Sequence, residues 1–322
     1  MLTEMYLKKL SPDRCAIIVR MQMIIDKNTA RMSAAALVTV ILWASSFPVV
    51  KYLLEFSTAE SIMLLRFLVA SLTIGIISVM KKIRLPSKRD VPLFAAAGFV
   101  GIMIYQWCFN TGTGMVPAGV SSFLIAAAPV YTTLLSVFIL KEKVRLICWI
   151  GIIVSFGGQF IIAVSEMIGL VLNIGVFLVI GASVSHSIYI IIQRKLLKTY
   201  TFFEVTAYPI FFGTLFMLVF LPGLIKEMPL LPLDANLLNI YLGVFPAALA
   251  YLAWAYALSK AKNTVNATIF LYLIPLMATL IAFLWLSETI TIIEFVGGLI
   301  IILGMIVSNL KTGDKGDLKQ ET

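Results

Sequence analysis

The chain has 322 residues and a net charge of +9, and 61% of its residues are apolar whereas only 13% are charged. Its mean hydropathy is +1.01, and soluble domains are near half apolar and about a quarter charged. This composition excludes a soluble globular protein and indicates a polytopic membrane protein. The positive charge lies mostly at alternate helix ends, so it reflects membrane topology and not a nucleic-acid partner.

Apolar runs long enough to cross a bilayer recur along the chain. A bilayer core of about 30 Å requires roughly 20 apolar residues per helix. Runs near this length predict ten transmembrane helices, at 34–54, 61–80, 93–115, 119–140, 146–164, 168–192, 202–221, 237–258, 264–286 and 290–310. The alternation typical of barrel strands is absent. The predicted fold is therefore an all-α, polytopic membrane protein.

Residues 1–32 precede the first predicted helix and are interpreted as a cytoplasmic N-terminal leader. One helical face is apolar and could lie on the inner leaflet, formed by Ile17, Ile18, Met21, Ile24 and Ile25. A mobile leader, or translation that begins at Met21 or Met32, is the simpler interpretation. The apolar run is too short and too interrupted by charge for a signal peptide.

The first two predicted helices carry unusual residues. Trp43, Ser45 and Ser46 lie mid-helix beside Pro48, which predicts a kink because proline deprives one carbonyl of its partner. Arg66 is the one full charge well inside a predicted span. Burying it costs about 2.5–3.5 kcal/mol, so it is expected to face the bundle or extend to the membrane surface. A structural anchor is the favoured interpretation, and contact with a substrate anion is the alternative.

The stretch 118–164 is repeated at 264–310, displaced by 146 positions without a gap. The matched pairs include rare residues that apolar similarity alone does not align: Pro129 with Pro275, Glu142 with Glu288, Gly151 with Gly297 and Gly158 with Gly304. Tyr105 matches Tyr251 at the same displacement, and Trp43 matches His186 at a displacement of 143.

The repeated unit contains five predicted helices, an odd number, so its second copy must enter the membrane from the opposite face. We therefore predict two inverted five-helix repeats, 33–165 and 166–310, followed by a cytoplasmic tail at 311–322. Many secondary transporters are built in this way, with the binding site between the halves near the middle of the membrane.

The positions of Lys and Arg predict the orientation. With both termini cytoplasmic, 22 of the 25 basic residues lie on the inner side, and the outer side keeps only Lys51 and Lys226. This positive-inside pattern predicts an integral multi-pass protein, placed in a bacterial inner (plasma) membrane, with both termini in the cytoplasm.

Polar and aromatic groups suited to a substrate cavity gather on the first, third, sixth, eighth and ninth predicted helices. They are Trp43, Ser46, Tyr105, Gln106, Asn110, His186, Tyr189, Tyr251, Trp254, Asn266 and Tyr272. Each has a simpler explanation, because Trp and Tyr are enriched at membrane interfaces and a lone intramembrane His often bonds to a neighbouring helix.

Two further pairs of matched residues, one of prolines and one of glutamates, are candidate functional residues of the repeated helices. Pro129 and Pro275 are predicted to break equivalent helices near the cavity, although they could simply bend them. Glu142 and Glu288 stand at helix ends on opposite faces, which favours helix-end or gate roles over a proton relay at the midplane.

Several energy sources and cofactors are excluded by the sequence. The chain has no GxxxxGK[ST] motif for ATP, and its single His and three scattered Cys leave no plausible zinc or haem site. We therefore expect no cofactor, no metal and no catalytic residues. Transport is predicted to be driven by a substrate gradient or by exchange. Proton coupling is expected only through His186 or through Glu142 and Glu288 at the helix ends.

Long segments of the chain carry the motifs LLRFL, Pro129 to Glu142 followed by WIGIIVSFGG, AYLAWAYALSKAKNTVNATIFLYLIPLMATLIAFLWLSETIT, and FVGGLIIILG. In these motifs the region 34–310 resembles the drug/metabolite transporter superfamily, EamA-like branch. The resemblance implies export of amino acids and other metabolites through a central cavity. One departure is His186, where this branch usually carries Trp.

The leading prediction is a secondary-active exporter of small metabolites such as amino acids or other amphipathic zwitterions. An aromatic cavity with few fixed charges favours these over phosphates, which usually require several Lys or Arg. The alternatives are a membrane-embedded lipid-modifying enzyme, for which we find no acid, base or metal cluster, and a non-transporting scaffold or channel. The expected partners are a small-molecule substrate and the lipid bilayer, with no nucleic acid and no obligatory protein partner.

Overall fold

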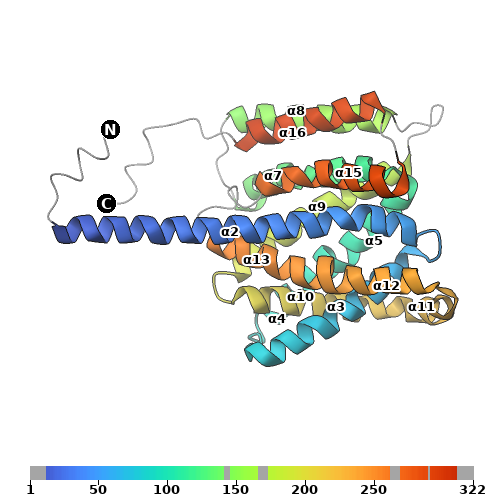
Figure 1. Cartoon of the computed structure of the whole chain (residues 1–322), viewed down its shortest axis with the longest axis horizontal. Helices are drawn as coiled ribbons and strands as arrows, with labels where there is room; N and C mark the ends of the chain where they lie inside the picture. Colours follow the sequence, from blue (N-terminus) through green and yellow to red (C-terminus); the bar gives the residue numbers. More distant parts are fainter. Residues whose placement is uncertain (1–11, 141–145, 166–172, 262–268, 289–290, 310–322) are drawn as a thin grey trace.

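The computed structural model describes residues 12–140, 146–165, 173–261, 269–288 and 291–309; within them, some side chains, including those of 12–28, are not described. All regular structure in these ranges is helical (Figure 1). The elements are α2 (Pro12–Leu53), α3 (Ala59–Lys81), α4 (Val91–Gly98), the π-helix η1 (Phe99–Ile104), α5 (Tyr105–Met115), α6 (Ala118–Ala126), α7 (Ala128–Leu140), α8 (Leu146–Ser165), α9 (Ile174–Leu196), α10 (Phe202–Met217), η2 (Leu218–Phe220), α11 (Leu221–Glu227), η3 (Met228–Leu230), α12 (Leu233–Leu242), the π-helix η4 (Gly243–Leu249), α13 (Ala250–Lys260), η5 (Ile269–Tyr272), α15 (Leu273–Leu286) and α16 (Ile292–Asn309).

The described helices have the length and composition of a multi-pass membrane protein. Six segments are long and apolar enough to cross a bilayer: Thr29–Leu53, Ala59–Lys81, Val91–Met115, Ile174–Leu196, Phe202–Leu230 and Leu233–Lys260. Four shorter apolar helices fall on the remaining predicted spans: Ala118–Thr132, Trp149–Ile162, Leu273–Leu286 and Phe295–Gly304. The positions of the predicted spans thus agree with the described helices.

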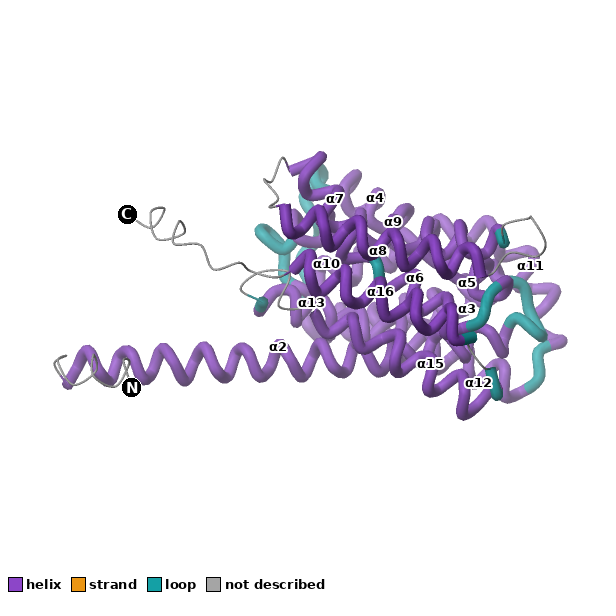
Figure 2. The backbone as a smooth tube through the Cα atoms, turned by 90° about the horizontal axis from the view of Figure 1, so that it is seen from above, coloured by secondary structure: helices purple, strands orange, loops and turns teal. Residues whose placement is uncertain are grey.

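Helix α2 extends further than the first predicted span. It is one helix of 42 residues with Pro48 inside it, near its C-terminal end. Figures 1 and 2 show its N-terminal half projecting beyond the bundle. The part of the predicted leader from residue 12 onward is therefore helical and continuous with the first span, with no break at residue 32.

The bundle is layered around α2 and α9. Helix α2 packs against α13 and α15, and α9 packs against α5, α6 and α7. Helix α3 contacts α10 and η4 on one side of this centre, and α8 packs along α16 as an outer layer on the other (Figure 1). The largest group of buried apolar side chains lies between α2, α5, α6, α9 and α15.

The backbones of α8 and α16 approach each other closely where both helices carry glycine. A Cβ added at Gly158 would lie 2.6 Å from the carbonyl oxygen of Gly297, and one added at Gly304 would lie 2.6 Å from that of Gly151. Lipid is as apolar as the helix surfaces, so association in a membrane depends on close packing, which small residues permit. These glycines therefore allow the two backbones to touch.

We predict that Gly158→Ala lowers the melting temperature (Tm) of the detergent-purified protein, because the new methyl group overlaps the α16 backbone and such overpacking costs roughly 1–3 kcal/mol. The matched control is Gly157→Ala, one position away, where an added Cβ meets nothing within 4 Å. Its Tm is expected to be unchanged or slightly higher. Equal Tm values for the two variants would contradict the close crossing.

Candidate functional site

A small cavity lies inside the bundle where both halves of the chain meet. Its lining comes from α2, α3, α5, α6, α7, α9, α13, η5 and α15: Trp43, Ser46, Phe47, Arg66, Tyr105, Gln106, Phe109, Ile125, Ala126, Ala128, Pro129, His186, Tyr251, Leu271 and Ile274. The cavity volume is about 30 Å³, far below the roughly 300–1,000 Å³ of pockets that hold small molecules. A metabolite can enter only if the helices around it move.

Aromatic rings dominate one wall of this cavity. The ring of Trp43 lies 5.4 Å from that of Tyr251 and 5.6 Å from that of His186, and the rings of Tyr105 and His186 are 5.2 Å apart. The edge-to-face and tilted geometries are those that aromatic pairs prefer. Four different helices are thereby held together around the cavity.

Two of these rings differ in their hydrogen bonds. Trp43 Nε1 donates to the carbonyl oxygen of Pro246 at 3.1 Å, whereas the buried Nδ1 of His186 has no hydrogen-bond partner among the described residues. Pro246 lies in η4, directly before the helix that carries Tyr251, and η1 likewise leads into Tyr105. Short π-helices occur frequently at functional sites.

The structure brings most of the predicted cavity residues together. Those that line the cavity are Trp43, Ser46, Tyr105, Gln106, His186 and Tyr251. Three others are buried behind it: Asn110 donates to the carbonyl of Ala59 at 3.2 Å, the Tyr189 hydroxyl accepts from Gln193 at 2.9 Å, and Trp254 packs against Trp43. Asn266, the side chain of Tyr272 and Glu142 lie outside the described residues.

Arg66 lines the cavity although its favoured interpretation was a structural anchor. It is 2% exposed, which rules out extension to the membrane surface in this conformation. Sequence reasoning also missed Phe47 and Phe109, whose rings pack 5.0 Å apart. No local signal separates such apolar residues from those that face lipid, because both are apolar positions on apolar helices.

The two predicted helix breaks lie beside interruptions in the helices. Ala127 separates α6 from α7, two residues before Pro129, and η5 gives way to α15 at Leu273, two residues before Pro275. Pro129 lines the cavity, as do residues on either side of the second interruption. An interrupted helix frees backbone carbonyls, which suits a binding site.

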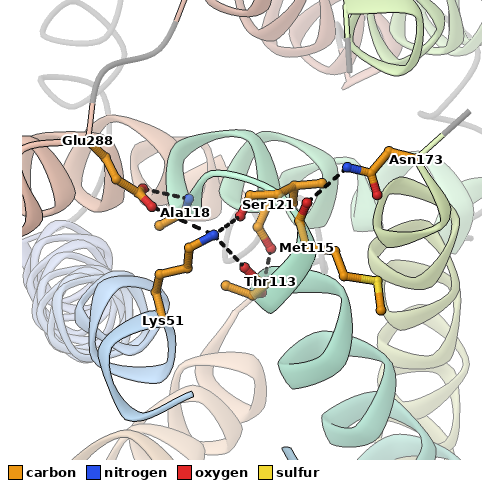
Figure 3. Close-up of polar contacts among 8 residues, drawn as sticks. Lys51, Thr113, Met115, Ala118, Ser121, Asn173 and Glu288 are labelled. Atoms are coloured by element: carbon orange, nitrogen blue, oxygen red, sulfur yellow. Dashed lines mark hydrogen bonds and ion pairs between the residues drawn. The ribbon is translucent and has the colours of Figure 1, made fainter. Parts of the chain in front are cut away.

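Glu288 lies at one end of the bundle, where it joins three segments (Figure 3). Its Oε2 accepts from the backbone N–H of Ala118 at 2.8 Å, and its Oε1 is 3.8 Å from Lys51 Nζ. Lys51 also donates to the carbonyl oxygens of Val116 at 2.8 Å and Thr113 at 3.3 Å. The ends of α2 and α15 are thereby fastened to the turn between α5 and α6.

The same turn is held from α9 as well. Asn173, the residue before α9, donates through Nδ2 to the carbonyl oxygen of Met115 at 2.9 Å, and the hydroxyls of Thr113 and Ser121 are 2.7 Å apart (Figure 3). Polar contacts at this end of the bundle therefore connect α2, α5 and α6 with the residues that adjoin α9 and α15.

We predict different costs for two changes at Glu288. Glu288→Gln removes the ion pair with Lys51. The side chain of Lys51 is 27% exposed and that of Glu288 is 20% exposed, and ion pairs exposed to this degree contribute less than about 1 kcal/mol. Its amide oxygen can still accept from Ala118. Glu288→Ala loses that bond at the helix start as well, which adds about 1 kcal/mol. The Tm should fall in the order wild type, Gln, Ala; equal losses would contradict the role of the Ala118 contact.

Comparisons with known proteins bear on this site. The family model of the EamA-like transporter family matches residues 31–164 and 173–310. The uncharacterized transporter YdfC of Bacillus subtilis (strain 168) is 34% identical over 88% of this chain and 93% of its own. A "Probable terminal-alkyne amino-acid exporter" of Streptantibioticus cattleyicolor is 34% identical over 86% and 93%.

A solved structure, described only as "Crystal structure of protein", agrees in fold. It has a TM-score of 0.63 and 16% identity, and the match covers 88% of this chain and 99% of the other. The family model and the two relatives confirm the family resemblance noted in the sequence, and the relatives' names are those of transporters. The chain is a multi-pass membrane protein that belongs to the EamA-like transporter family.

Proposed function

We propose that this protein is a secondary-active exporter of amino acids or similar amphipathic zwitterions, working by alternating access around the cavity. The observation that carries the proposal is the group of contacting rings Trp43, Tyr105, His186 and Tyr251, which line the cavity together with few polar side chains. Aromatic faces accommodate both an apolar side chain and an ammonium group. The relative named as an amino-acid exporter supports the same substrate class.

We also propose that ten membrane helices form two inverted repeats, 33–165 and 166–310. Corresponding helices pack in corresponding ways: α5 packs on α9 as α13 packs on α2, and α6 and α7 pack on α9 as α15 packs on α2. The matched rings do the same, because Trp43 meets Tyr251 and His186 meets Tyr105. Such a pair of repeats is suited to alternating access, in which one half moves against the other.

The proposed orientation places both termini in the cytoplasm of a bacterium. Basic side chains gather in the segments that follow α3 and α9, at Lys82, Arg84, Lys88, Arg89 and Lys198. At the opposite helix ends, the basic residues in the described part of the chain are Lys51 and Lys226. This asymmetry supports a cytoplasmic location for the basic end, with Glu142 and Glu288 on opposite faces.

Counterflow in proteoliposomes tests the function. The panel would contain L-leucine, L-phenylalanine and L-propargylglycine, a terminal-alkyne amino acid, with sugar phosphates as the control class. We expect saturable, gradient-driven exchange of at least one amino acid, and no response to an imposed proton gradient. Exchange of sugar phosphates alone would contradict the proposed substrate class, and strict proton dependence lost in His186→Ala would contradict uncoupled transport. Absence of any saturable flux would favour a scaffold, a channel or an enzyme.

Cysteine labelling tests the inverted repeat. In a background without Cys15, Cys108 and Cys148, we expect a membrane-impermeant maleimide to label Glu288→Cys in intact cells. We expect Glu142→Cys to be labelled only after permeabilisation, because the two proposed repeats enter the membrane from opposite faces. Labelling of both positions from the same side would contradict the inversion.

A further inference from the structure

Arg66 is a buried cation with no anionic partner among the residues that the structure describes. It lies on α3 and is 2% exposed. Its Nη1 donates to Gln106 Oε1 at 3.3 Å, and its Nε has no hydrogen-bond partner in the described part of the chain. The ring of Phe67 lies 5.8 Å from the guanidinium carbon. Among the residues that the structure describes, no carboxylate forms an ion pair with it.

These contacts compensate the charge only in part. Removing an ion from water costs several kcal/mol in a protein, and an opposite charge with good geometry is the usual compensation. A single neutral acceptor at 3.3 Å leaves most of the five N–H donors of the guanidinium unused. The site is therefore arranged to receive an anion.

The cavity determines where that anion would bind. Arg66 and Gln106 line the same cavity as the rings of Trp43, Tyr105, His186 and Tyr251. A guanidinium binds a planar carboxylate through two parallel hydrogen bonds. One cation among aromatic rings suits a monoanion with an apolar part better than a phosphate, which usually requires several cations.

We propose that Arg66 is a specificity-determining residue that binds the carboxylate of the transported molecule. Gln106 positions the guanidinium from α5, and the ammonium and apolar side chain of the substrate face the aromatic wall. This inference rests on the proposed function, since it concerns the substrate of the same cavity. It changes the role of Arg66 from an anchor between helices to a group that selects carboxylates.

Ligand binding to the purified protein in detergent tests the inference. The probes are L-leucine, L-phenylalanine and L-propargylglycine, each compared with its own amide, which keeps the ammonium and side chain but has no carboxylate. We expect at least one amino acid to bind the wild type roughly ten- to a hundredfold more tightly than its amide. This comparison needs no variant, so it does not depend on whether a substituted protein folds.

Three variants assign the preference to Arg66. Arg66→Met should bind the amino acid and its amide equally, and Arg66→Lys should keep a weaker preference because an ammonium lacks the planar pair of donors. The matched control is Ser71→Ala, on the same helix, where the hydroxyl contacts Thr214 at 2.8 Å and does not line the cavity. It should bind as the wild type does.

The outcomes separate this inference from the proposed function. If no amino acid binds the wild type better than its amide, or if Arg66→Met keeps the preference, the inference is wrong even when counterflow shows amino-acid exchange. If binding depends on the carboxylate and on Arg66 but counterflow shows no exchange, the proposed transport is wrong and the carboxylate site stands.

Discussion

The structure depends on the pairing of polar groups in a medium that offers them no partner. Within a bilayer the backbone must satisfy its own hydrogen bonds, and helices gain little from apolar contact because lipid is equally apolar. The outer helices α8 and α16 accordingly associate through glycine contacts. The central helices α2 and α9 pack on their neighbours through rings and hydroxyls, such as that of Ser187 on α9, which donates to the carbonyl of Ala128 on α7 at 2.8 Å. The polar side chains of the interior thus both hold the helices together and line the cavity.

The small cavity and the contacts of Glu288 with Ala118 and Lys51 are features of one conformation of this bundle. The cavity volume is only about 30 Å³, and the helix ends nearest Lys51 are held by several hydrogen bonds and one partly exposed ion pair. Contacts of this kind are individually weak, because water competes for each of them. A set of weak contacts at one end of a bundle can open without disrupting the packed centre, which is the property that a movable gate requires.

The matched halves of the cavity are similar but not identical. Trp43 and His186 occupy matched positions, and each ring contacts a tyrosine from the opposite half. Trp43 is anchored by its bond to the carbonyl of Pro246, whereas the Nδ1 of His186 has no partner among the described residues. Arg66 is likewise present on one side only, because the position 143 residues later is Pro209. Arg66 thus places the charge in the first half of the chain, and in the binding mode proposed above it would give a zwitterionic substrate a preferred direction.

The sequence by itself determined the class of the protein, the approximate positions of its helices and several polar and aromatic residues that line the cavity, because apolar length and polar residues within apolar runs are local signals. Tertiary structure decided which of them meet. It placed Trp43, Gln106 and His186 on the cavity but Asn110 and Tyr189 behind it, and it brought Arg66 in beside the rings. These outcomes depend on the rotation of each helix about its axis, which is set by contacts between segments far apart in the chain. The local pattern of an intramembrane helix cannot fix that rotation, since its buried and lipid-facing sides are both apolar.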